Sequence, residues 1–341
     1  MNILLLQLKR IGDLVLTTPV IAALRDKFPE AVLTLIVSRE GAPLLPAITG
    51  VDRTHVIHRR LSDVKIFRAV AREKFDYCID FTGNDRSALL ASLSRAKKRI
   101  TSEWTRTQSK IRGSAYNEFV ADRVSDMHTL DFHFTLLEPL GIRNASTTIK
   151  LQLPSAAREK ANEIRRSYKI EPINPFAIFH PGSARMEKFW DAQRWADVID
   201  YARSILKFTP VLTSGSSALE RQHIAEIKGK LAQPVVDLSG KIDLLTLTAL
   251  IEQARLIVTV DTAPMHLAAA METPQVILFG PTNPFHWRPR ESTALILQGR
   301  STSPVATFTL EQPCFSMNDI STEAVINAMN SLLSAPAVQA S

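Results

Sequence analysis

The chain has 341 residues, a net charge of +7 at neutral pH and a pI of about 9.5. A content of 45% hydrophobic and 22% charged residues is ordinary for a globular protein and excludes a disordered or fibrous one. The two cysteines, Cys78 and Cys314, form no zinc or disulfide pattern, and no apolar stretch predicts a membrane span or a signal peptide.

The first half of the chain reads as strands that alternate with helices. Apolar and β-branched runs predict strands at 2–8, 31–38, 54–59, 77–82 and 97–101. Apolar residues at helical spacing predict helices at 11–29, 64–75, 84–95 and 131–141. This alternation is typical of a parallel sheet with helices on its faces.

A second series of the same kind follows a polar segment. Residues 153–176 contain three prolines and one amphipathic helix, and we interpret them as a linker region. Strands are then predicted at 175–182, 210–215, 234–240, 256–263 and 274–282, and helices at 192–206, 219–231, 244–254 and 264–272. The prediction is an α/β protein with two doubly wound domains at 1–155 and 175–325, followed by a C-terminal helix and tail at 326–341.

Ligands of doubly wound sheets bind beyond the carboxyl ends of the strands, so polar residues that follow strands are candidates for a site. After the first strand come Lys9, Arg10, Gly12 and Asp13. Gly12 allows a tight or φ-positive turn, and a helix N-terminus favours the ionised form of Asp13, which could serve as a general base. The alternative is a plain helix cap with a structural glycine.

In the second half, residues suited to a diphosphate follow the strands. Ser183, Arg185 and Lys188 offer a hydroxyl and two cations after one strand, and Thr213 follows another. Asp261 and Thr262 end a third strand, and free backbone N–H groups at the next helix would bind an anion. His266 follows Thr262 by about one helical turn and is a further candidate. The alternatives are that 183–188 is an ordinary solvated loop and that His266 is a structural hydrogen-bonding residue. The shared position at strand ends predicts one cleft between the domains.

The basic residues concentrate in the first half of the chain. Between Arg53 and Arg123 there are sixteen lysines and arginines. One interpretation is a docking surface for a polyanionic acceptor, and the other is an ordinary solvated basic face.

Together these segments resemble glycosyltransferase family 9, the lipopolysaccharide heptosyltransferases. The resemblance is carried by LLLQLKRIGDLVLTTPVIAALRDKFP at the N-terminus, by HPGSARMEKFW, by VTVDTAPMHLAAAM and by LFGPTNPFHWRP, in the family's order. The TSG turn and the WRP segment look most like the heptosyltransferase III branch.

The resemblance implies a GT-B fold, two Rossmann-like domains facing a cleft, with a C-terminal helix that returns to the first domain. It implies inverting transfer of heptose from ADP-heptose to the phosphorylated inner core of lipopolysaccharide, without a cofactor or catalytic metal. By motif, Asp13 is the expected base, Lys188 and Ser183 bind the diphosphate, and Lys9 and Arg10 line the acceptor side. The expected donor-binding residues also include Arg185, Thr213, Asp261, Thr262, Ala263 and His266.

The resemblance further implies a cytoplasmic enzyme of the Gram-negative envelope that adheres by charge to the inner membrane. The chain departs from the family pattern at Ala263 and Ala184, and Glu220 or Ser217 could take the place of an expected acidic residue. These departures leave another nucleotide sugar as an alternative donor. A non-catalytic basic protein that binds nucleotides or nucleic acid is the alternative from another class, although no nucleic-acid recognition motif is present. The sequence gives no indication of oligomeric state.

Overall fold

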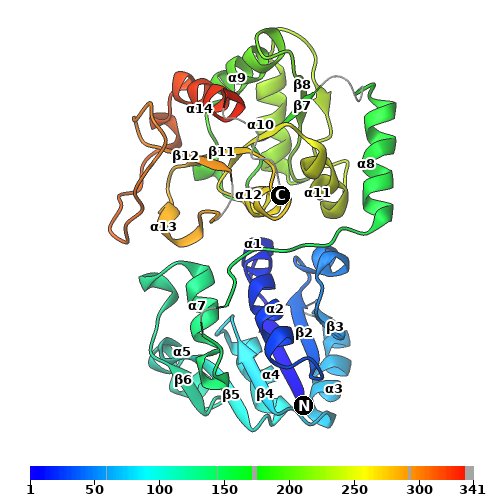
Figure 1. The fold of residues 1–341 in the computed structure, drawn as a ribbon, viewed down its shortest axis with the longest axis vertical. Helices are drawn as coiled ribbons and strands as arrows, with labels where there is room; N and C mark the ends of the chain where they lie inside the picture. The colour runs from blue at the N-terminus through cyan, green and yellow to red at the C-terminus, as the bar shows by residue number, and fades with distance from the viewer. Residues whose placement is uncertain (59, 144, 171–174, 291–292, 335–341) are drawn as a thin grey trace. The chain divides into compact units, whose positions relative to one another are not determined.

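The computed structural model describes residues 1–58, 60–143, 145–170, 175–290 and 293–334. The chain divides into two compact units, Met1–Gln152 and Leu153–Ser341, each built around its own sheet (Figure 1). Among the described residues, no helix combines the length and the apolar character that crossing a bilayer requires.

The first unit contains a six-stranded parallel sheet in the order β3-β2-β1-β4-β5-β6. Strand β1 lies between two neighbours, with Leu4 opposite Thr34 on one side and Cys78 on the other. Because both faces of a central parallel strand are covered, Ile3 to Leu6 are fully buried. The strands are β1 (Asn2–Gln7), β2 (Val32–Ser38), β3 (Arg53–Ile57), β4 (Tyr77–Asp80), β5 (Lys98–Ser102) and β6 (Glu118–Val120).

The helices of the first unit differ from the prediction in three places. The helix predicted at 131–141 ends at Thr135 and is followed by a 3₁₀ turn at Glu138–Leu140. The single helix predicted at 11–29 is two helices, because Pro19 has no N–H for the carbonyl of Val15, which instead accepts the hydroxyl of Thr18 at 2.8 Å. Two short helices and a strand also lie at 103–120, where no element was predicted. The helices are α1 (Ile11–Val15), α2 (Thr18–Lys27), α3 (Val64–Arg72), α4 (Asp85–Ser94), α5 (Glu103–Gln108), α6 (Lys110–Gly113) and α7 (Thr129–Thr135), with 3₁₀ turns η1 (Ala42–Ala47), η2 (Leu61–Asp63), η3 (Val124–Asp126) and η4 (Glu138–Leu140).

The second unit repeats this design with the sheet order β12-β11-β10-β7-β8-β9. Counted from its own first strand β7, the pattern matches that of the first unit, so in each sheet the strand order reverses beside the first strand. The strands are β7 (Phe176–His180), β8 (Thr209–Leu212), β9 (Val236–Asp237), β10 (Leu256–Val260), β11 (Gln275–Phe279) and β12 (Ala294–Gln298). Two parallel doubly wound sheets confirm the predicted GT-B class, with ligand sites expected between β1 and β4 and between β7 and β10.

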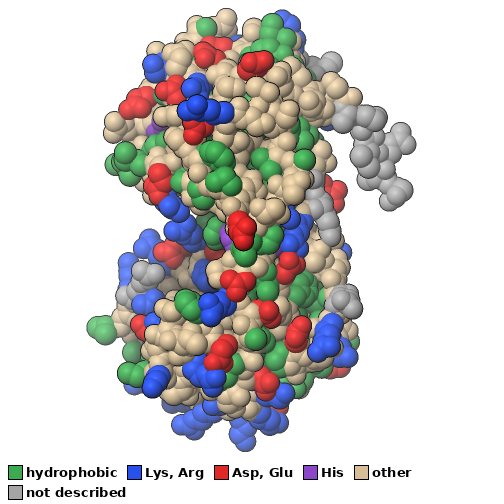
Figure 2. Space-filling view, turned by 90° about the vertical axis from the view of Figure 1, so that its left-hand side faces the viewer, with side chains coloured by type: hydrophobic (Ala, Val, Ile, Leu, Met, Phe, Trp, Pro, Cys, Tyr) green, Lys and Arg blue, Asp and Glu red, His purple; other side chains and the backbone are tan. Residues whose placement is uncertain are grey.

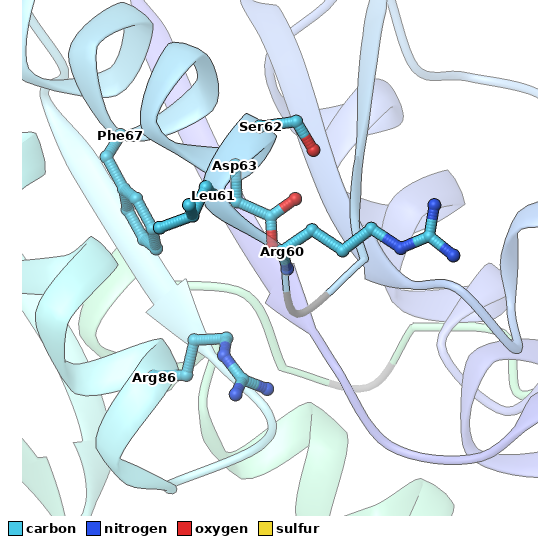
Figure 3. A pocket seen from close by; sticks show the side chains of 6 residues that line it. All are labelled: Arg60, Leu61, Ser62, Asp63, Phe67 and Arg86. Carbon is cyan, nitrogen blue, oxygen red and sulfur yellow. Dashed lines mark hydrogen bonds between the residues drawn. The ribbon is translucent and has the colours of Figure 1, made fainter.

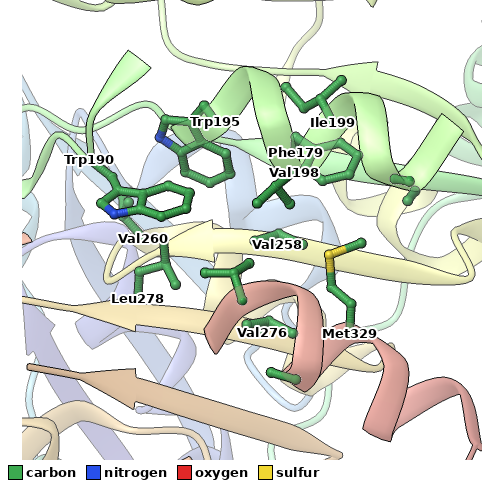
Figure 4. Close-up of a cluster of buried hydrophobic side chains, with 14 of the residues drawn as sticks. Phe179, Trp190, Trp195, Val198, Ile199, Val258, Val260, Val276, Leu278 and Met329 are labelled. Atoms are coloured by element: carbon green, nitrogen blue, oxygen red, sulfur yellow. The ribbon is translucent and has the colours of Figure 1, made fainter. Parts of the chain in front are cut away.

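The helices of the second unit pack around a core of apolar side chains that includes Trp190 and Trp195, whose rings meet edge to face (Figure 4). Met329 of α14 enters the same core, next to Val276 of β11. The helices are α8 (Ser155–Ser167), α9 (Ala192–Ser204), α10 (Ala218–Lys228), α11 (Leu244–Gln253), α12 (Ala263–Ala270), α13 (Pro284–Trp287) and α14 (Thr322–Ser334), with 3₁₀ turns η5 (Met186–Lys188) and η6 (Met317–Asp319).

Two predicted boundaries differ from the structure. Helix α8, placed in a linker, belongs to the second unit, where it packs on α11 and Arg158 forms a bidentate ion pair with Glu252. Helix α14 begins at Thr322 rather than 326 and packs on α9, β11 and β12 of the second unit. The parts of these predictions at 171–174 and 335–341 lie outside the described residues, as does residue 59 of the third predicted strand.

Candidate functional site

In the first unit, the turn after β1 presents Asp13 at the third position of α1. The Asp13 side chain is half-buried, and burial raises the pKa of its carboxyl group while the ammonium group of Lys9 and the backbone N–H of Arg10 oppose the rise. A raised pKa makes this carboxylate a stronger base than a solvated aspartate. Lys9 is half-buried and Arg10 is exposed on the same turn.

The tight or φ-positive turn predicted at Gly12 is wrong. Gly12 lies inside α1 and is not among the residues with positive φ, so no left-handed turn requires a glycine there. The chain instead bends at Lys9, and Arg10 has an extended backbone with φ −79° and ψ 168° immediately before the helix.

The end of β4, next to β1, carries a buried carboxylate that the sequence did not single out. Asp80 is 1% exposed and accepts hydrogen bonds from the backbone N–H groups of Thr82 and Gly83, at 2.8 and 3.2 Å, and from the hydroxyl of Tyr116 at 2.5 Å. Burial raises the pKa of Asp80. The hydroxyl of Thr82 in turn accepts the N–H of Leu8 at 2.7 Å, so Asp80 supports the turn that leads to Asp13.

In the second unit, the structure brings together Lys188 and Asp261. The Nζ atom of Lys188 lies 2.5 Å from Oδ2 and 2.8 Å from the carbonyl oxygen of Asp261, and both residues are 7% exposed. Thr282, in the loop after β11, donates its hydroxyl to the same Oδ2 atom at 2.5 Å. No local pattern pairs Thr282 with Asp261, because the two residues are 21 positions apart.

Helix α12 begins directly after this cluster, with Thr262 as its N-cap and Ala263 as its first residue. The Thr262 hydroxyl donates to the carbonyl of Val260 at 3.2 Å and makes no capping bond, so it leaves the N–H of Ala263 uncapped. Pro264 has no N–H, and the N–H of Met265 donates to the carbonyl of Thr262 at 3.1 Å. His266, in the first turn, is 3% exposed, and its Nδ1 atom has no hydrogen-bond partner in the described part of the chain. Burial lowers the pKa of His266 to about 4, which keeps the ring neutral.

The remaining predicted donor residues take separate positions. His180 at the end of β7 and Thr213 after β8 are hydrogen bonded at 2.9 Å and buried. The hydroxyl of Ser183 is 5% exposed and accepts the N–H of Arg185. The guanidinium group of Arg185 pairs with Glu187 and is 40% exposed, so it is not part of the Lys188 cluster.

Glu220 and Ser217, the two candidates for the acidic residue expected from the family pattern, belong to one capping box. Ser217 is the N-cap of α10, and Glu220 accepts the N–H of Gly215 at 3.0 Å and the hydroxyl of Ser217 at 2.7 Å. A Cβ atom built on Gly182 would lie 2.8 Å from Oε1 of Glu220, so this carboxylate lies against the turn after β7.

Chemically, the second unit offers a buried ammonium group, the uncapped N–H of Ala263 and a neutral imidazole at the carboxyl ends of β7 and β10. Lys188 uses two directions of its ammonium group on Asp261, and the third remains for a phosphate oxygen. Such an arrangement has the charge and the hydrogen-bond donors that a diphosphate requires. Among the described residues, no group of three or more His, Cys, Asp or Glu side chains is placed to hold a metal ion.

Comparisons with known proteins find a matching family model and several similar chains. The family model described as "Glycosyltransferase family 9 (heptosyltransferase)" matches residues 64–315. Lipopolysaccharide heptosyltransferase 3 of Escherichia coli K12 is 29% identical over 291 residues, which cover 82% of each chain.

Two solved structures share the fold. A glycosyl transferase family 9 protein of Veillonella parvula is 24% identical, with a TM-score of 0.83 and 97% of both chains covered. E. coli heptosyltransferase WaaC with ADP-2-deoxy-2-fluoro heptose is 17% identical, with a TM-score of 0.71, 97% of this chain covered and 99% of that one.

Proposed function

The chain belongs to glycosyltransferase family 9, and from this premise we propose that it transfers a heptose from ADP-heptose to the inner core of lipopolysaccharide. The buried Lys188–Asp261–Thr282 cluster at the start of α12 is the observation that carries the choice of a nucleotide diphosphate donor. The E. coli K12 relative is a lipopolysaccharide heptosyltransferase, and the ADP-sugar in the WaaC structure supports the choice of nucleotide.

In the proposed reaction, Asp13 removes the proton from an acceptor hydroxyl, and the resulting oxygen attacks C1 of the heptose from the face opposite ADP. The bond between C1 and the diphosphate oxygen breaks, and ADP leaves with the negative charge. Lys188 and the N–H of Ala263 at the start of α12 stabilise that charge on the leaving group. Because the base and the donor residues belong to different units, turnover requires both halves of the chain.

The donor is tested by ADP binding, measured by calorimetry. We expect Lys188→Met to weaken ADP binding by roughly tenfold or more, because a charge-assisted hydrogen bond to phosphate is lost. Lys228→Met is the matched control, since it breaks a 2.7 Å ion pair with Asp237 in the same unit. Competition by UDP instead of ADP would identify another nucleotide sugar, and binding of oligonucleotides in preference to ADP would contradict the transferase assignment.

The acceptor is tested by incubating the enzyme with ADP-heptose and lipopolysaccharides of truncated core. We expect a mass gain of one heptose on one acceptor, and no transfer to any of them would contradict the proposal. We expect the reaction to need no metal or other cofactor, so a chelator should leave the rate unchanged. If the chelator abolishes transfer and a divalent cation restores it, the expectation of a metal-independent reaction is overturned.

We also propose peripheral contact with the cytoplasmic face of the inner membrane, where the acceptor is made. Two apolar side chains of the first unit are strongly exposed, Leu61 at 92% and Ile111 at 88%. Leu61 lines an open hollow of about 840 Å³, with Phe67 beside it and Arg86 of α4 opposite (Figure 3). Lys and Arg side chains are spread over the visible face of this unit (Figure 2). Exposed apolar groups among cations favour an anionic bilayer.

Vesicle sedimentation tests the membrane contact. Binding to anionic vesicles should weaken with added salt and with Leu61→Ser combined with Ile111→Ser. The control is Ile205→Ser, an apolar residue of the second unit that is 61% exposed. Equal binding by the wild type and by the double variant would refute this docking face.

A further inference from the structure

The backbone carbonyl of Asp13 is held by a side chain that the reaction does not use. In a regular helix the N–H of Thr17 would donate to the carbonyl of Asp13. Here the N–H of Thr17 donates to the carbonyl of Leu14 at 3.0 Å, because α1 ends at Val15 and α2 begins at Thr18. The hydroxyl of Thr17 takes its place and donates to the carbonyl of Asp13 at 2.8 Å.

The hydroxyl of Thr17 is fixed by Gln7, the last residue of β1. The Nε2 atom of Gln7 donates to Oγ1 of Thr17 at 2.9 Å and lies 3.4 Å from the carbonyl oxygen of Asp13. Gln7 is 1% exposed and Thr17 is fully buried, so water does not compete for these bonds. The contact therefore ties the end of the central strand to the turn that carries Asp13.

His133 of α7 closes the network from the other side. Its Nδ1 atom lies 3.2 Å from the carbonyl of Leu16 and 3.5 Å from Oγ1 of Thr17. The single hydroxyl proton of Thr17 is directed to Asp13 and a carbonyl can only accept, so Nδ1 carries the ring proton. Burial, with help from the charge of Lys9, lowers the pKa of His133 to about 3, so the ring stays neutral and its tautomer is set.

We propose that Thr17 is a positioning residue for Asp13, and that its hydroxyl, oriented by Gln7 and His133, fixes the direction of the Asp13 carboxylate. The five residues of α1 form too short a helix to be stable alone, so the geometry of its last turn depends on this hydroxyl. The inference rests on the proposed function, in which Asp13 is the general base.

The test compares Thr17→Val, which removes the hydroxyl at nearly constant volume, with Thr17→Ser, which keeps it. We expect Thr17→Val to lower kcat by about tenfold with little change in either KM, because a displaced base is less effective at unchanged substrate binding. Thr17→Ser should stay within about threefold of the wild type. The control is Thr248→Val, which removes a buried hydroxyl bonded at 2.7 Å to a carbonyl four residues earlier in α11.

A double-mutant cycle separates this inference from the proposed function. In the Asp13→Asn background, Thr17→Val should lower kcat no further, because Thr17 acts through Asp13. If Asp13→Asn is strongly impaired but Thr17→Val still lowers the residual kcat about tenfold in that background, the positioning role is refuted while the base assignment stands. If Asp13→Asn keeps full activity, the base assignment itself fails.

Gln7→Met supplies a second variant should Thr17→Val not fold. It removes the amide that orients the hydroxyl and should lower kcat by about threefold with unchanged KM. A kcat equal to that of the wild type would contradict the role of the network.

Discussion

The buried pair of Lys188 and Asp261 allows the most quantitative prediction about the second unit. Lys188→Met removes the ammonium group that lies 2.5 Å from the Asp261 carboxylate. Among the residues that the structure describes, the hydroxyl of Thr282 is then the one side chain still bonded to this carboxylate. Lys188 and Asp261 are each 7% exposed in the folded protein. An uncompensated buried charge remains.

Removing one partner of a buried ion pair typically lowers the free energy of unfolding by about 3–5 kcal/mol. The hydroxyl of Thr282 still solvates the carboxylate, so we expect about 3 kcal/mol, the low end of that range. The double variant Lys188→Met with Asp261→Leu also removes the carboxylate charge. It should therefore recover part of the lost free energy of unfolding, although two residues are changed. The control Lys228→Met breaks an ion pair whose lysine side chain is 47% exposed. It should lower the free energy of unfolding by less than about 1 kcal/mol.

The assay is urea unfolding followed by tryptophan fluorescence in a Trp104→Phe background. The remaining tryptophans, Trp190, Trp195 and Trp287, all belong to the second unit, and the first two are fully buried. A loss below about 1 kcal/mol for Lys188→Met would refute the reasoning, because it would show that the pair is hydrated in solution.

Two further predictions concern stability. Burial lowers the pKa of His180 and His266 from 6.5 to about 4, so between these values the unfolded chain binds more protons and the free energy of unfolding falls as the pH drops. His266→Gln should reduce the slope of the free energy of unfolding against pH by up to about 1.4 kcal/mol per pH unit. The raised pKa of Asp80 contributes a slope of opposite sign, which this substitution leaves in place. An unchanged slope in urea titrations from pH 7 to 5 would contradict this prediction. Tyr116→Phe removes the 2.5 Å bond to the buried Asp80 and should lower the free energy of unfolding by about 1–3 kcal/mol, whereas an unchanged melting temperature would show that water replaces the hydroxyl.

Ten of the twelve described strands of the two sheets were predictable from local pattern, and the edge strands β6 and β12 were missed. Central strands such as β1 and β10 are continuous apolar runs because both faces are covered, and they were placed within a few residues. The region at 103–120 was not predicted, because its helices α5 and α6 are six and four residues long and carry no apolar period.

The candidate site was predictable as residue types but not as contacts. Motifs placed Lys188 and Asp261 after separate strands, yet their direct pairing links residues 73 positions apart. Thr17 and His133 are 116 positions apart, and nothing local signals that they meet beside the turn of Asp13. The break between α1 and α2 was readable in principle, since Thr18-Pro19 is a typical helix start.

The central claim is that Asp13 is the base of a heptosyl transfer, and single-turnover transfer from ADP-heptose to truncated-core lipopolysaccharide tests it most directly. Wild type should transfer one heptose, and Asp13→Asn should be slower by about two or more orders of magnitude with ADP binding retained. Transfer by Asp13→Asn at the wild-type rate would contradict the account and leave Asp13 as an acidic residue in the first turn of α1.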